Sequence, residues 1–184
     1  MNGFEKVLND VDEFCKRVKI KYAVMGGMAV LAHGISRSTD DVDINILVRL
    51  EDLSKIGEKI ITCFQPLHIN PIEFFEKNFV LPVTHSKTGI GIDFAAGLSG
   101  FDETAIKRSK KKKFFSLSLP CITIEDLIIY KLFAARDKDL LDLKEIAKVH
   151  KEKIDRIYLK DMLVKFAELE RTDMEKVFEK IFKL

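Results

Sequence analysis

The stretch that decides the fold is residues 24–44, Val24-Met-Gly-Gly-Met-Ala-Val-Leu-Ala-His-Gly-Ile-Ser-Arg-Ser-Thr-Asp-Asp-Val-Asp-Ile44. A short apolar run ends at Gly26 and Gly27, and the apolar segment 28–33 after them predicts a short helix. A strand that ends in glycines and opens into a helix brings backbone N–H groups close to a ligand, where the helix N-terminus favours negative charge. The pattern predicts a phosphate-binding turn at Gly26-Gly27. The alternative is a tight turn without a ligand, which would use the same two glycines.

The second half of this stretch carries a pair of carboxylates, Asp41 and Asp43, on a predicted strand over 41–48. Residues two apart on a strand share a face and lie roughly 6.5–7 Å apart along it, whereas Asp40 points to the opposite face. Like charges so placed repel unless a cation joins them. Oxygen ligands suit Mg²⁺ or Mn²⁺ better than zinc, and two such ions about 3.5–4 Å apart serve phosphoryl chemistry. The alternative is an exposed strand end without a ligand.

A third acid, Asp93, interrupts an otherwise apolar run in Gly89-Ile-Gly-Ile-Asp-Phe-Ala95. A carboxylate in such a run is costly to bury unless something binds it. Asp93 is therefore either the third ligand of the same site or a strand-end residue before the loop that contains Gly97 and Gly100.

The rest of the chain predicts an α+β fold. Apolar spacing predicts helices over 4–18 and 53–64 and strands over 79–84, 89–94 and 114–119, with a hairpin turn at 86–88 and a boundary at Pro120. Beyond it we expect helices over 124–136, 138–150, 155–169 and 172–183, the first of them capped by Thr123. We therefore expect a mixed-sheet core over residues 1–120 with flanking helices and a C-terminal helical part over 121–184.

Composition sets the outer limits of this interpretation. The chain has 184 residues, and 31 Lys and Arg against 29 Asp and Glu give a net charge of +2, which excludes a uniformly basic nucleic-acid binder. No apolar run approaches the roughly 20 residues that span a bilayer. Charged residues interrupt the apolar positions of the N-terminal segment 1–21, so it lacks the apolar core of a signal peptide. The three cysteines, Cys15, Cys63 and Cys121, have no metal-binding spacing, so we expect them to be reduced. Together with the lack of a long apolar run, this predicts a cytoplasmic protein without a membrane partner.

Taken in order, Gly26-Gly27, Arg37-x-Thr39-x-Asp41-x-Asp43 and the later Asp93 resemble the nucleotidyltransferase superfamily of DNA polymerase β-like enzymes. Within that superfamily the chain is most similar to the small bacterial AbiEii-type nucleotidyltransferases. The resemblance implies that the glycine turn holds a triphosphate and that Asp41, Asp43 and Asp93 are the catalytic residues that hold two Mg²⁺ or Mn²⁺ ions.

Arg37 and Thr39 match the Arg-x-Thr that precedes the carboxylate pair in this subgroup, which implies a role in nucleotide binding. Arg37 would either pair with the triphosphate or brace the nearby aspartates, and Thr39 is typical of a residue that stabilises the turn before a strand. Many superfamily members have Gly-Ser where this chain has Gly26-Gly27, so a serine hydroxyl that could bind phosphate is absent.

The resemblance continues through residues 124–142, which look like the subgroup's helix–turn–helix and imply nucleotide-binding roles for Lys131 and Arg136. Lys131 lies on an apolar helix face, so it needs a carboxylate or a bound phosphate as partner unless its ammonium reaches solvent. Arg136 and Asp139 are three residues apart and would also be placed to pair with each other.

A run of basic residues, Lys107-Arg-Ser-Lys-Lys-Lys-Lys113, is the largest local concentration of charge. It would either contact an RNA backbone or form a solvated hairpin loop. The apolar positions of the last two predicted helices are typical of packing, and they would also serve an antitoxin partner or a homodimer.

The function that these features and the resemblance imply is Mg²⁺-dependent transfer of an NMP from an NTP to a hydroxyl acceptor, with release of pyrophosphate. The acceptor would be tRNA, a protein or a small molecule, and the setting a toxin–antitoxin or phage-defence system. Two alternatives stay open. One is an aminoglycoside or lincosamide antibiotic nucleotidyltransferase, and the other is a catalytically silent nucleotide-binding protein or antitoxin partner.

Overall fold

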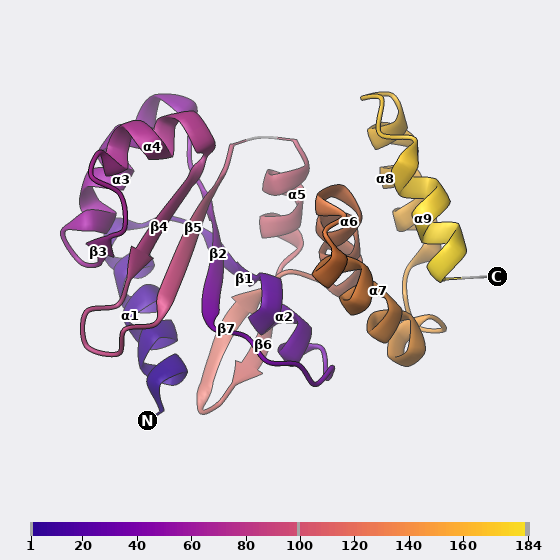
Figure 1. Cartoon of the computed structure of the whole chain (residues 1–184), viewed down its shortest axis with the longest axis horizontal. Coiled ribbons are helices and arrows are strands. Elements are labelled where there is room, and N and C mark those ends of the chain that lie inside the picture. Colours follow the sequence, from indigo (N-terminus) through magenta and orange to yellow (C-terminus); the bar gives the residue numbers. More distant parts are fainter. Residues whose placement is uncertain (1, 99, 183–184) are drawn as a thin grey trace. The chain divides into compact units, whose positions relative to one another are not determined.

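A computed structural model describes residues 2–98 and 100–182 of the chain (Figure 1). The chain divides into two compact units. The first contains residues 1–32 and 37–122, and the second contains residues 33–36 and 123–184. The sequence-based division at residues 120 and 121 stays a prediction. None of the helices in the described part of the chain is long and apolar enough to cross a membrane.

The first unit is built on a seven-stranded mixed sheet with the strand order β3-β4-β5-β2-β1-β7-β6. Its strands are β1 (Tyr22–Met25), β2 (Asp41–Leu47), β3 (Gln65–Pro66), β4 (Val80–Thr84), β5 (Gly91–Gly97), β6 (Lys110–Phe114) and β7 (Leu117–Cys121). Its helices are α1 (Gly3–Val18), α2 (Gly26–Ala32), α3 (Leu53–Ile61), α4 (Pro71–Asn78), α5 (Phe101–Arg108) and the short 3₁₀ turn η1 (Leu50–Asp52). The predicted α+β class with a mixed sheet is confirmed.

The two faces of the sheet have different roles because side chains alternate along each strand. On one face, Phe94 of β5 packs edge-on against Phe14 of α1, with ring centroids 6.0 Å apart, and Phe64 joins the same cluster. Asp41 and Asp43 on the other face of β2 are only partly buried, whereas Asn45, which continues their alternation, is buried. The core therefore lies on the α1 face, and the polar residues of β2 face the other way.

The second unit is helical and contains α6 (Ile124–Ala134), α7 (Asp137–His150), α8 (Arg156–Ala167) and α9 (Asp173–Ile181). Thr123 caps α6 as predicted, because its hydroxyl accepts a hydrogen bond from the N–H of Asp126 at 3.2 Å. The carboxylate of buried Asp126 also accepts from the Thr123 and Tyr158 hydroxyls, at 2.8 and 2.6 Å. These bonds tie the start of α6 to α8.

The prediction of one strand over 114–119 is wrong. The chain turns at Phe115, which has a left-handed φ of 55°, so that β6 ends at Phe114 and β7 begins at Leu117. Pro120 lies inside β7 and is not a boundary. Lysine is uncommon in strands, yet Lys110–Lys113 of the basic run form most of β6.

Candidate active site

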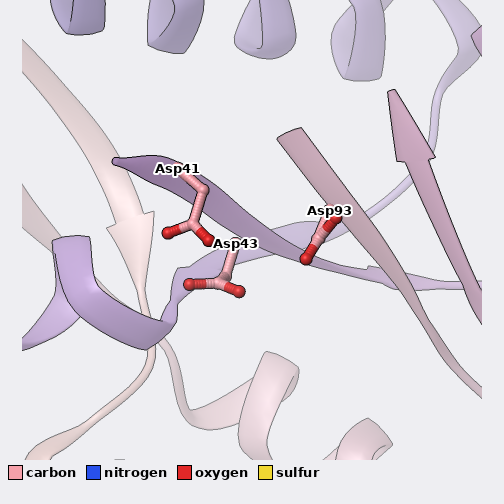
Figure 2. A group of neighbouring side chains, drawn as sticks. All are labelled: Asp41, Asp43 and Asp93. Carbon is pink, nitrogen blue, oxygen red and sulfur yellow. The ribbon is translucent and has the colours of Figure 1, made fainter. Parts of the chain in front are cut away.

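The strand register brings the three predicted acids together. β2 and β5 are parallel neighbours, and Asp43 lies directly beside Asp93 in their register, with Asp41 one step away on the same face of β2. Each residue offers one carboxylate oxygen, and these oxygens all lie within 4.8 Å of one another. Figure 2 shows the three side chains projecting from the two adjacent strands. The spacing on one strand and a parallel pairing thus create a single acidic centre.

Gly26 and Gly27 pack directly against this centre. Gly26 has a left-handed φ of 58°, and a Cβ added there would lie 1.8 Å from Oδ2 of Asp43. A Cβ on Gly27 would lie 2.5 Å from Oγ1 of Thr39, and the Gly27 N–H donates to Oδ2 of Asp43 at 3.4 Å. The two glycines are needed because the start of α2 passes so close to the carboxylate of Asp43.

Thr39 and Arg37 lie beside the same glycines. The Thr39 hydroxyl donates to Oδ1 of Asp41 at 3.1 Å, within hydrogen-bond distance also of the Asp41 carbonyl at 3.2 Å, so Thr39 orders the entry to β2. The Arg37 guanidinium carbon lies 3.5 Å from the position that a Cβ on Gly27 would take, and its Nε donates to the Ser38 carbonyl at 2.9 Å. Both residues therefore stand next to the acidic centre and the glycine turn.

Asn45 and Asp102 also belong to this face, and the sequence motifs indicated neither of them. Asn45 follows Asp41 and Asp43 in the alternation of β2, and its amide nitrogen donates to Oδ1 of Asp102 at 3.2 Å. Asn45 is 1% exposed, so α5 covers the sheet directly beyond the acidic centre. The alternation Asp41-x-Asp43-x-Asn45 is the sequence signal for Asn45, whereas no sequence pattern predicts α5.

The donor set of the centre fits a hard divalent cation. It consists of carboxylate oxygens alone, which are the ligands that Mg²⁺ and Mn²⁺ prefer, and all three side chains are partly exposed, so water could complete the coordination. Three converging carboxylates repel one another, and a bound cation removes that repulsion. The geometry and chemistry of the acidic centre therefore fit a divalent metal ion.

Lys131 and Arg136 belong to the second unit and form an ion-pair cluster there. The buried Lys131 ammonium donates to Asp139 at 3.2 Å and to Asp142 at 2.6 Å, and Arg136 Nε donates to Asp139 at 2.7 Å. Burial raises the pKa of Asp139, but the hydrogen bond from Arg136 and the charge of Lys131 outweigh it and lower that pKa overall. Of the partners considered for Lys131, the structure shows carboxylates, and the predicted pairing of Arg136 with Asp139 is confirmed. The nucleotide-binding roles of both residues stay predictions.

Comparison with known families decides which chemistry this arrangement belongs to. A family model described as nucleotidyl transferase AbiEii toxin, type IV toxin–antitoxin system, matches residues 15–183. The chain belongs to the AbiEii nucleotidyltransferase toxin family. This AbiEii-family chain is thus a member of a nucleotidyltransferase enzyme family, and Asp41, Asp43 and Asp93 form its candidate catalytic triad. No curated protein sequence matches the chain.

Solved structures share the fold of this AbiEii-family chain. An antigenic nucleotidyltransferase-like protein from Paracoccidioides brasiliensis has a TM-score of 0.54 at 12% identity, with 97% of this chain and 96% of that chain covered. The antibiotic-resistance factor ANT(2'')-Ia has a TM-score of 0.54 at 10% identity, covering 96% and 90% of the two chains. The lincomycin-bound lincosamide adenylyltransferase LnuA has a TM-score of 0.50 at 18% identity, covering 77% and 95%. At these identities the likeness shows the fold alone.

Proposed function

We propose that this AbiEii-family protein transfers an NMP from an NTP to a hydroxyl acceptor with Asp41, Asp43 and Asp93 as its catalytic carboxylates. The observation that carries the proposal is the convergence of the three carboxylate oxygens within 4.8 Å beside a glycine turn. Family membership supports nucleotidyl transfer, and the donor chemistry supports Mg²⁺ or Mn²⁺ as the cofactor.

In this proposal each residue of the first unit has a distinct task. Asp41 and Asp43 would hold the ions that neutralise the triphosphate, and Asp93 would be a further ligand for the ion that activates the acceptor hydroxyl. Gly26 and Gly27 let the start of α2 approach the phosphates, while Thr39 holds Asp41 in place through its 3.1 Å hydrogen bond. Arg37 lies close enough to the turn to contact a phosphate. When bound, the metal supplies charge stabilisation for the in-line displacement at the α-phosphorus.

The transfer needs no reactant besides the NTP and the acceptor. The acceptor oxygen forms a bond to the α-phosphorus while the bond to the pyrophosphate oxygen breaks, and the acceptor proton leaves to a base or to water. Fixed geometry and electrostatic stabilisation of the transferring phosphoryl group supply most of the rate in such reactions. The sequence-based prediction of an antitoxin partner is supported by the toxin–antitoxin description of the family.

The test is an NMP-transfer assay with each labelled NTP in turn, Mg²⁺ or Mn²⁺, and RNA, protein and small hydroxyl compounds as separate acceptors. We expect label on one acceptor class, with release of pyrophosphate. Asp93→Asn should lose this transfer, whereas Asp40→Asn, which changes an exposed neighbouring carboxylate, should keep it. Equal transfer by wild type and Asp93→Asn would contradict the assignment of Asp93.

A further inference from the structure

The strand β6 lies at one end of the sheet and carries the sequence Lys-Lys-Lys-Lys-Phe over Lys110–Phe114. Its only strand neighbour among the described residues is β7, so the other edge of β6 faces no strand. The helix α2 packs nearby, but Lys110, Lys111 and Lys113 remain exposed. This edge is an available surface for main-chain pairing.

The direction of the free backbone groups follows from the ladder. Ile122 N–H donates to the Val24 carbonyl at 3.1 Å, so Ile122 and, by alternation, Pro120 turn their backbone groups toward β1. Pro120 lies opposite Lys111 in the β6–β7 register, and Pro has no N–H to donate. Lys111 and Lys113 therefore direct their N–H and carbonyl groups away from β7, to the outer edge.

The same two residues also present their charges at this edge. Lys111 and Lys113 share one face of β6, and no carboxylate in residues 2–98 or 100–182 forms an ion pair with any of Lys110–Lys113. A groove of about 580 Å³ adjoins this face and is lined by five lysines, Lys16, Lys19, Lys21, Lys107 and Lys111. Asp12 also lines this groove and pairs with Lys16, and Lys107 pairs with Glu103. Lys19, Lys21 and Lys111 therefore supply its excess positive charge, although the whole chain is nearly neutral.

These observations favour a protein strand over a nucleic acid as the occupant. A peptide strand would use both the outward backbone groups and the lysine charges, whereas an RNA backbone would use the charges alone. The groove lining also contains no arginine, and its one aromatic residue, Tyr22, is 7% exposed with its hydroxyl bound to Asp12. An RNA site would present an exposed aromatic face for base stacking.

We propose that the outer edge of β6 binds an acidic, extended segment of a partner protein, which adds to the sheet as an antiparallel strand. Acidic residues in an acid-x-acid pattern lie opposite Lys111 and Lys113 and pair with them across the strands. Edge lysines keep two copies of this chain from pairing with each other, because like charges then face one another, yet they attract an acidic strand.

The experiment measures binding of a synthetic peptide of alternating Glu and Thr to the full-length chain by fluorescence anisotropy and amide hydrogen exchange. We expect saturable binding that slows exchange of the Lys111 and Lys113 amides more than that of other residues. The double change Lys111→Glu and Lys113→Glu should weaken binding at least about tenfold, while Lys176→Ala on α9 should leave it unchanged.

Peptide variants test strand pairing without altering the protein. In an antiparallel pairing the Glu residues opposite Lys111 and Lys113 direct their N–H groups to β6, so N-methylation of the Glu residues should weaken binding about fivefold or more. N-methylation of the Thr residues should have little effect, since those N–H groups point to solvent. Equal loss with both peptides, or no loss with either, would refute the added strand.

An oligouridylate of matched net charge serves as the competing probe. If the oligouridylate binds more tightly than the Glu-Thr peptide, and Phe115→Ala weakens it, the basic surface is a nucleic-acid contact and the proposal is wrong. Phe115 is the informative residue because it is 45% exposed at the β6–β7 turn and could stack on a base.

Discussion

The molecule contains two clusters of aspartates, and they differ in how the repulsion between their carboxylates is compensated. In the second unit, Asp139 and Asp142 are 3% and 10% exposed, and the Lys131 ammonium lies between them. In the first unit, Asp41, Asp43 and Asp93 are partly exposed and point their oxygens at one another. The Asp139–Asp142 cluster is neutralised by a lysine of its own chain. The Asp41, Asp43 and Asp93 cluster has the geometry to be neutralised by a bound cation instead.

This difference separates stability from function. A buried carboxylate that has lost its cationic partner destabilises the fold, because the charge stays desolvated. Removing one carboxylate from a group whose members repel one another instead lowers the repulsion in the folded chain, and only ligand binding is weakened. Matched substitutions in the two clusters should therefore move stability and activity in different directions.

The largest effect should come from Asp43→Asn. We expect NMP transfer to fall by about a thousandfold or more, because the side chain nearest both Gly26 and Asp93 loses its charge. The free energy of unfolding without metal should stay the same or rise, since one of three converging negative charges is gone. Rate assays and urea unfolding of the same preparation measure both quantities.

Mg²⁺ provides the control for this prediction. A ligand at a hundred times its Kd stabilises the fold by about 2.7 kcal/mol, so Mg²⁺ should raise the Tm of the wild type and fail to raise that of Asp43→Asn. A Tm increase of equal size in both proteins would show that the ion binds elsewhere.

The opposite outcome is expected for Lys131→Met. This change keeps the apolar stem but leaves Asp139 and Asp142 buried together, so the free energy of unfolding should fall by about 3–5 kcal/mol. Lys138→Met, on the exposed side of α7, should change it by less than about 0.5 kcal/mol. Combining Lys131→Met with Asp142→Asn should restore part of the loss. Urea denaturation followed by circular dichroism distinguishes these variants, and a loss below about 1 kcal/mol would refute the role given to the pair.

The two clusters also differ in what the sequence could reveal. The triad was predictable, because Asp41 and Asp43 lie on one face of a strand and Asp93 stands alone in an apolar run. What no periodicity could supply was the parallel pairing that sets Asp43 beside Asp93. Lys131 was recognisable as a lysine that needs a partner, but its choice of Asp139 and Asp142 depends on the α6–α7 packing.

The edge strand β6 illustrates a different limit. Four consecutive lysines have no alternation of polarity, so neither a strand period nor a helix period appears in them. Pairing with β7 stabilises β6, in which Phe114 is buried, and Leu119 is buried on the neighbouring β7. Tertiary pairing outweighed local propensity here, as it also did for Pro120 within β7.

A smaller effect is expected for Gly26→Ala. Alanine at φ 58° costs about 1–2 kcal/mol, and its Cβ would displace the Asp43 carboxylate, which stands 1.8 Å from that position. Gly89→Ala is the matched control, because Gly89 has a φ of 72° and nothing lies within 4 Å of its added Cβ. Both variants should lose stability in thermal unfolding, Gly26→Ala the more because its Cβ also meets Asp43, but only Gly26→Ala should lose NMP transfer. Transfer lost equally in both would mean that the contact with Asp43 is unimportant.

The smallest effect is expected for Arg136→Ala, because the Arg136 side chain is 62% exposed and Asp139 keeps its bond to Lys131. We expect a loss of about 1 kcal/mol or less in the free energy of unfolding at pH 7.

This loss of stability in Arg136→Ala should become smaller as the pH falls. The pKa of Asp139 is lowered in the folded chain, so its ion pairs stabilise the fold above the ordinary aspartate pKa, and this contribution disappears as the pH falls through the lowered value. Removing Arg136 lets the folded pKa rise toward its usual value. The stabilities of wild type and Arg136→Ala, compared by urea unfolding at pH 7 and then at successively lower pH, should therefore converge in acid. A gap that widens in acid would show that Arg136 acts on the fold through packing and not through the charge of Asp139.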